Sequence, residues 1–100
     1  MATIDPKDIK REDLDGRGRY TWDLDGVEAE LAYTITSPKL RIADHTVVPD
    51  PLRGSGVGHA MVERFVADAK EEGFKILPLC PFVNAERAKH PDWADYFETN

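Results

Sequence analysis

The stretch that decides the fold runs from Asp44 to Glu72 and reads DHTVVPDPLRGSGVGHAMVERFVADAKEE. It joins an apolar strand to an amphipathic helix through the glycine-rich loop Arg53 to Gly58. Glycine lets the backbone adopt positive φ and approach a ligand closely, and the unpaired N–H groups at a helix N-terminus attract an anion. This order of elements predicts a cradle for a pyrophosphate group.

Three kinds of glycine loop must be separated, because glycine spacing alone is weak evidence. A P-loop ends in Lys followed by Ser or Thr, whereas this loop ends in His59 and Ala60. A dinucleotide fingerprint needs a glycine at position 59 and a βαβ unit before the loop, and neither is present in the pattern. What remains is an Arg, two free positions, Gly, one free position and Gly, supplied by Arg53, Gly56 and Gly58.

Alternating apolar residues before the loop predict a three-stranded antiparallel meander, with strands near residues 20–24, 27–35 and 40–48. Asp25-Gly26 between the first two strands is typical of a hairpin turn. Ser37-Pro38 interrupts the second strand, and Pro49 and Pro51 end the third.

The second half of the chain predicts a helix, a strand and a further helix. In the first helix Val57, Met61, Phe65 and Ala69 recur every fourth residue, and Gly73 suits its C-cap. Residues 74–79 form a buried strand that pairs in parallel with the third strand through a right-handed crossover. Pro81 then opens a second helix that runs to about residue 88. The predicted fold is α/β (α+β), a mixed sheet with helices packed on it.

Composition limits the class of protein. One hundred residues suit one small domain, and we expect a polar N-terminal arm over residues 1–16 and a single domain over residues 17–100. No apolar run is long enough for a membrane helix or a signal peptide, and the only cysteine is unpaired, so we expect a cytoplasmic protein. A net charge of −6 argues against nucleic acid and mildly favours a cationic partner such as an amine. The oligomeric state is left open, with a monomer slightly favoured.

Cys80 and His45 are the candidate reactive residues. Cys80 falls at the N-cap of the second helix, where the helix dipole favours a thiolate. His45 lies toward the end of the neighbouring strand, so the two side chains could meet across the sheet, and histidine is the natural base near neutral pH. The alternatives stay open: Cys80 as a small buried apolar residue or a redox-sensitive thiol, and His45 as a polar residue at the strand edge.

No metal site is expected from the sequence. His45, His59 and His90 have no paired ligand spacing, and one cysteine cannot build a structural zinc site.

The loop motif, together with His45 before it and Pro78-Leu79-Cys80-Pro81 after the next helix, resembles the GNAT acyltransferase superfamily, and in particular a short single-domain (YjdJ-type) branch of it. The resemblance covers roughly residues 20–97. It implies an N-acetyltransferase that uses acetyl-CoA as co-substrate and an unidentified amine as acceptor, with His45 and Cys80 as the active-site pair.

The resemblance also implies which residues bind the cofactor. The loop would hold the pyrophosphate through Arg53 and the backbone of residues 54–58, namely Gly54, Ser55, Gly56, Val57 and Gly58. The strand residues Thr46, Val47 and Val48 would pair with the pantetheine arm and polarise the thioester carbonyl, and Asn84 would bond the same arm.

Two questions remain open at the level of sequence. An amine could attack acetyl-CoA directly, with His45 or Cys80 taking the proton, or the acetyl group could pass through Cys80. Only Asp25-Gly26 separates the first two predicted strands, so the helices that usually shape an acceptor pocket in the superfamily have no room. The alternative function is therefore a non-catalytic acyl-CoA-binding or protein-interaction module.

Overall fold

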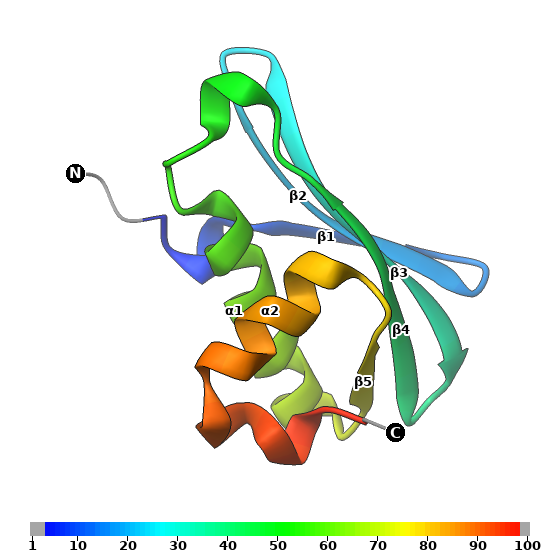
Figure 1. Ribbon diagram of the computed structural model, residues 1–100. Helices are drawn as coiled ribbons and strands as arrows, with labels where there is room; N and C mark the ends of the chain where they lie inside the picture. The colour runs from blue at the N-terminus through cyan, green and yellow to red at the C-terminus, as the bar shows by residue number, and fades with distance from the viewer. Residues whose placement is uncertain (1–3, 99–100) are drawn as a thin grey trace.

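The computed structural model describes residues 4–98 and contains one five-stranded sheet with two α-helices on one of its faces (Figure 1). The strands lie in the order β1-β2-β3-β4-β5, antiparallel from β1 to β4 and parallel between β4 and β5. Their bounds are β1 (Lys10–Leu14), β2 (Arg17–Leu24), β3 (Val27–Ser37), β4 (Leu40–Val47) and β5 (Lys75–Pro78). The helices are α1 (Val57–Glu72) and α2 (Pro81–Lys89), with 3-10 turns η1 (Pro6–Asp8), η2 (Asp50–Leu52) and η3 (Pro91–Tyr96). This is the predicted mixed α/β class.

The first strand, β1, differs from the expectation of a polar arm. It pairs along its whole length with β2, from Lys10 opposite Thr21 to Leu14 opposite Arg17. Its side chains are mostly exposed, so it carries no apolar period that would reveal a strand in the sequence. The arm prediction is therefore wrong for residues 10–14, and its first three residues lie outside the described part of the chain.

Local sequence signals correctly predict the hairpin turn between β2 and β3 and the end of α1. Asp25 and Gly26 have φ of 53° and 82°. A two-residue hairpin turn needs such left-handed values at both of its central residues. Gly73 ends α1 with φ of 78°, and its N–H donates to the carbonyl of Ala69 at 2.9 Å. These hairpin and C-cap predictions are confirmed.

The core lies between the helices and the sheet. The apolar stripe of α1 is buried and meets Tyr20 of β2, Leu31 and Tyr33 of β3, and Ile76 of β5, all at most 1% exposed. Burying this stripe holds α1 on the sheet, since helical stability in proteins comes mainly from packing of an amphipathic face. The N-terminus of α1 is thereby fixed beside the end of β4.

Strand β5 follows β4 for only four residue pairs, from Leu40 opposite Lys75 to Ala43 opposite Pro78. The predicted strand over residues 74–79 is thus shorter at both ends. Beyond Ala43, β4 continues to Val47 beside β3 alone, while the chain after β5 turns into α2. The two strands separate at this point, which leaves room between the end of β4 and α2.

Within the described residues, no helix has the length and apolar character that crossing a membrane requires.

Candidate functional site

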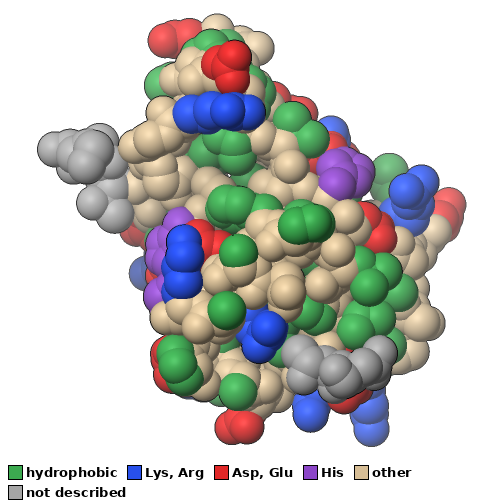
Figure 2. Space-filling model, viewed as in Figure 1, with side chains coloured by type: hydrophobic (Ala, Val, Ile, Leu, Met, Phe, Trp, Pro, Cys, Tyr) green, Lys and Arg blue, Asp and Glu red, His purple; other side chains and the backbone are tan. Residues whose placement is uncertain are grey.

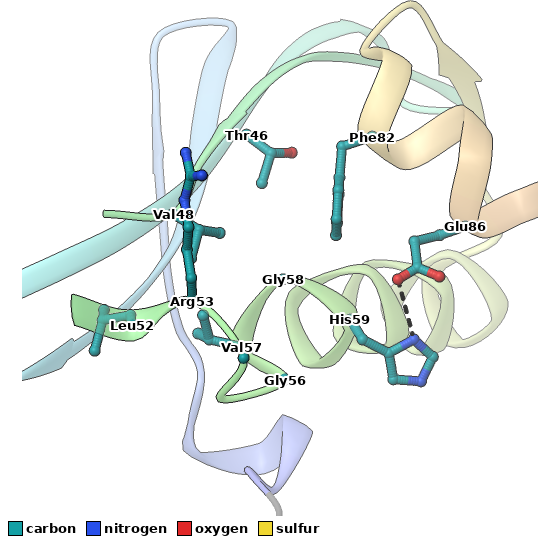
Figure 3. A pocket seen from close by; sticks show the side chains of 11 residues that line it. Thr46, Val48, Leu52, Arg53, Gly56, Val57, Gly58, His59, Phe82 and Glu86 are labelled. Atoms are coloured by element: carbon teal, nitrogen blue, oxygen red, sulfur yellow. Dashed lines mark ion pairs between the residues drawn. The ribbon is translucent and has the colours of Figure 1, made fainter. Parts of the chain in front are cut away.

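A cavity of about 590 Å³ opens where β4 and β5 separate (Figure 3). Its walls come from the end of β4 and the residue after it (Thr46, Val48), the η2 turn and loop (Leu52–Gly54, Gly56), the first turn of α1 (Val57–His59) and α2 (Phe82, Glu86). This volume is within the range of about 300–1,000 Å³ typical of small-molecule sites. The cavity is the leading candidate for the functional site.

The glycine loop presents the helix N-terminus to this cavity. Gly54 and Gly56 have φ of 83° and 86°, a left-handed conformation that costs side-chain-bearing residues about 1–2 kcal/mol. The first bond of the helical ladder runs from the N–H of Ala60 to the carbonyl of Gly56 at 3.0 Å. Helix geometry leaves the N–H groups of Gly58 and His59 without an acceptor inside α1, so they can bind an anion.

Gly58 has a second role that the motif did not reveal. A Cβ at this position would lie 2.6 Å from Cζ of Phe82, much closer than real Cβ contacts allow. The glycine therefore lets the aromatic ring of α2 lie against the first turn of α1. This contact forms one wall of the cavity.

Seven of the residues predicted to bind the cofactor line the cavity: Thr46, Val48, Arg53, Gly54, Gly56, Val57 and Gly58. The guanidinium of Arg53 is well exposed and pairs with Asp50 at 3.1 Å. The loop and the start of α1 thus have the backbone arrangement that the predicted cradle requires, and Arg53 lies at the rim.

Three predicted cofactor-binding residues do not line the cavity. Ser55 bonds within the loop, donating to the carbonyl of Leu52 and accepting from the N–H of Val57 at 3.2 Å. Val47 is about half exposed, and the side-chain carbonyl of Asn84 accepts from Arg87 at 2.9 Å. The structure assigns Ser55 to the shape of the loop and gives the other two no place in the cavity wall.

Four cavity residues were not predicted from the sequence: Leu52, His59, Phe82 and Glu86. The sequence contains one signal for two of them. Phe82 and Glu86 are four residues apart and therefore share a face of α2. In the sequence, His59 only distinguishes this loop from other glycine loops and lacks the spacing of a metal ligand.

Cys80 lies at the N-cap of α2, as predicted, and is buried at 3% exposure. Its N–H donates to the carbonyl of Ala43 at 2.9 Å, which fixes the turn at the point of strand separation. Its Sγ lies 3.4 Å from Oγ1 of Thr46, and either atom can be the donor. Thr46 lines the cavity, so the thiol stands directly behind the cavity wall.

His45 does not accompany Cys80. The pairing of β3 with β4 shifts at Asp44: Tyr33 is opposite Ala43, but Ala32 is opposite His45. This extra residue reverses the alternation of side chains. Thr46, opposite the buried Leu31, consequently faces the helices, while His45 faces the open side of the sheet.

On that open side, Nε2 of His45 is 3.3 Å from Oε1 of Glu30. Arg19 donates to the other oxygen of Glu30 at 3.1 Å. Partial burial acts to raise the pKa of Glu30, but the hydrogen bonds from Arg19 and His45 outweigh it and hold that pKa below its usual value. The predicted His45 and Cys80 pair is thus replaced by two separate contacts, Thr46 with Cys80 and Glu30 with His45.

Comparisons with known proteins identify the family of the chain. Residues 19–96 match the family model described as GCN5-related N-acetyl-transferase. A search of curated proteins found no match. Among solved structures, the chain is similar to the solution structure of a GCN5-like candidate N-acetyltransferase from Staphylococcus aureus. That match has a TM-score of 0.67 and 25% identity, and it covers 93% of this chain and 91% of the other.

The family model matches more than three quarters of the chain, which also has the glycine loop at the start of α1 and the separation of β4 from β5. The protein therefore belongs to the GCN5-related N-acetyltransferase family.

Proposed function

We propose that the protein is an acetyl-CoA-dependent N-acetyltransferase that transfers an acetyl group to an amine. The observation that carries this proposal is the cavity. It extends from the N-terminus of α1 to Thr46, whose side chain contacts Cys80. Acetyl-CoA combines the same two features, a pyrophosphate at one end and a reactive thioester at the other. Family membership supports the assignment.

In this proposal the N–H groups at the start of α1 bind the pyrophosphate. The pantetheine arm lies along the end of β4, where the strand has lost β5 as a partner and its backbone is free to pair. Val48 and Phe82 supply apolar contacts on either side. The thioester then lies near Thr46, at the point where the strands separate.

The reaction requires the amine nitrogen to attack the thioester carbonyl carbon. The bond from carbon to sulfur breaks, the sulfur leaves as the CoA thiolate, and a base removes one proton from the amine. The contact of Cys80 with Thr46 supports a second route in two steps. The Cys80 thiolate attacks the thioester carbon and releases the CoA thiolate, and the amine then attacks acetyl-Cys80 and releases the Cys80 thiolate. In the direct route, His45 is the candidate base. It lies beside Glu30 on the open face of the sheet and would take the proton from an amine that approaches from that face.

A non-catalytic acyl-CoA-binding module is the second candidate function. The observations in its favour are the burial of Cys80 and its separation from His45, because a nucleophile must reach its substrate and profits from an adjacent base. This candidate shares the cavity and differs only in turnover.

Calorimetric titration of acetyl-CoA and free CoA into the purified protein tests the common basis of both functions. We expect saturable one-to-one binding that Gly56→Leu weakens at least tenfold. Gly26→Leu is the matched control, since Gly26 also has positive φ and no neighbour within 4 Å but lies at the β2–β3 turn. Absence of binding at millimolar ligand, or equal loss in both variants, would contradict the proposed cavity.

Turnover separates the enzyme from the binding module. CoA release is followed over a panel of amines with the unmodified protein and with Cys80→Ala, Thr46→Val and His45→Ala. We expect Cys80→Ala to abolish turnover while CoA binding is kept, and the protein incubated with acetyl-CoA alone to gain the mass of one acetyl group on Cys80. If neither Cys80→Ala nor His45→Ala changes turnover, the catalytic assignment is wrong, and binding without turnover would establish the module.

A further inference from the structure

The side chains of His59, Glu86 and His90 form a cluster that the proposed acetyl transfer does not use. His59 is in the first turn of α1, Glu86 is on α2, and His90 follows α2 as its C-cap. One potential ligand atom from each residue lies within 4.8 Å of the other two. Histidine side chains gather at the left edge of the face in Figure 2, beside a carboxylate. Spacing along the sequence does not indicate this cluster, because the packing of α2 on α1 brings its members together.

The carboxylate of Glu86 is the unusual member of this cluster. Its side chain is only 10% exposed, and within residues 4–98 its ion-pair partner is His59, whose Nδ1 lies 3.5 Å from Oε1. A buried carboxylate is costly unless a positive charge or hydrogen bonds compensate it. A cation bound at or next to Nδ1 of His59 would compensate this carboxylate.

Glu63 contacts the other ring nitrogen of His59. Its Oε1 lies 2.8 Å from Nε2 of His59, close enough to accept a hydrogen bond from that nitrogen. In a neutral imidazole the proton is then on Nε2, and the lone pair of Nδ1 faces the Glu86 carboxylate. Two acceptors that face each other are suited to hold a metal cation between them.

We infer that His59, Glu86 and His90 bind a divalent transition-metal ion, with Zn²⁺ the best fit. Two imidazoles and one carboxylate are a ligand set that zinc uses, with bonds of about 2.0–2.2 Å. Tetrahedral geometry at that bond length places neighbouring ligand atoms about 3.3 Å apart, close to the 3.5 Å between His59 and Glu86. The three ligand atoms already lie within 4.8 Å of one another, so metal binding requires only a small contraction of the cluster.

The surroundings suit a metal site. A carboxylate that holds the second nitrogen of a metal-binding histidine is a recurrent arrangement, and Glu63 holds His59 in this way. Trp93 stacks on His90 with ring centroids 3.9 Å apart and an angle of 17°, which restricts the ring and shields one side of the cluster. His59 and Glu86 also line the cavity, so a fourth coordination position opens toward it.

The test uses the full chain, purified without a histidine tag and dialysed against a chelator. Zn²⁺ is titrated by calorimetry, with no CoA present, so the result is independent of the proposed function. We expect one-to-one binding that His59→Ala, His90→Ala and Glu86→Gln each weaken more than tenfold. Glu63→Gln, which leaves all three ligands in place, should weaken binding by about 10- to 100-fold.

Two controls make the assignment specific. His45→Ala removes a histidine outside the cluster, and Cys80→Ser removes the only thiol, so both should bind Zn²⁺ like the unmodified chain. Circular dichroism of each variant verifies folding. The Co²⁺ absorption spectrum of Glu86→Gln, a substitution that preserves side-chain volume, is compared with that of the unmodified chain and reports the ligand set directly. No binding by the folded chain would overturn the site. Binding that survives the loss of both His59 and His90 would overturn it as well.

Discussion

Asp68 illustrates at the residue scale how this small protein tolerates charge in its core. The residue is 8% exposed and accepts from the hydroxyl of Tyr20 at 2.7 Å and from Nε of Arg64 at 3.1 Å. Burial and the neighbouring carboxylate raise the pKa of Tyr20 far above its usual value, so the hydroxyl remains a donor. Arg64 also donates to the carbonyl of Ile9 at 2.6 Å, which ties the chain before β1 to α1.

Tyr20→Phe should therefore destabilise the fold. The substitution removes one hydrogen bond to a charged group, while Arg64 and Arg11 remain beside Asp68. We expect a loss of about 1.5–3 kcal/mol in the free energy of unfolding, measured by urea denaturation. Tyr96→Phe is the control, since the Tyr96 hydroxyl makes no hydrogen bond to residues 4–98. Equal stability of the two variants would show that the Tyr20 bond contributes nothing.

At the scale of elements, an ion pair joins the edge strand β1 to the end of α1. Nη2 of Arg11 donates to Glu72 at 2.9 Å, and Nη1 contacts the other carboxylate oxygen. The hydrogen bonds from Arg11 lower the pKa of Glu72 from its ordinary value of 4.5 and outweigh the opposing effect of partial burial. Strand β1 has few buried side chains of its own, so this pair is a main link between it and the helices.

The lowered pKa gives a prediction about acid stability. Glu72 binds a proton more weakly in the folded chain than in the unfolded chain. Its contribution is therefore complete above pH 4.5 and is lost as the pH falls through the folded-state pKa. Urea denaturation between pH 7 and pH 3 should show a smaller loss of stability on acidification in Glu72→Gln than in the unmodified chain.

Glu71→Gln is the control for that experiment, because Glu71 is an exposed neighbour with no ion pair to any described residue. Its pH dependence should match that of the unmodified chain. The Glu72 assignment fails if the two variants have the same pH dependence.

At the scale of the whole molecule, one aromatic cluster connects the sheet to the helices. Phe65 of α1 lies 5.2 Å from Tyr20, 4.9 Å from Tyr33 and 5.9 Å from Phe74 between ring centroids. These four rings bring together β2, β3, α1 and the start of β5. A chain of this length has little stability to spare, typically about 5–15 kcal/mol in total for a small domain.

Phe65→Ala should thus cost about 3–5 kcal/mol, a large share of that total, because it leaves a cavity among three other rings. Phe82→Ala removes the same side chain from the rim of the functional cavity, where Phe82 is 38% exposed, and should cost much less. Urea denaturation of both variants provides the comparison. Similar losses would mean that the core is not centred on Phe65.

The sequence by itself determined the features that depend on neighbouring residues. The turn at Asp25-Gly26, the buried stripe of α1, its C-cap at Gly73 and the glycine loop all follow from backbone preferences and short periodicities. The class of fold could be predicted for the same reason, whereas the walls of the cavity beside the loop also depend on α2. The position of Cys80 at a helix N-cap likewise required only Pro81 after it.

The tertiary structure alone decided which of these residues meet. Strand β1 is stabilised by pairing with β2 and by Arg11 rather than by an apolar pattern, so its sequence resembles an arm. One extra residue at Asp44 turns His45 away from Cys80 and places Thr46 there instead, and alternation along a strand cannot reveal such a shift. His59, Glu86 and His90 converge because α2 packs on α1, a long-range contact that spacing within one segment does not encode.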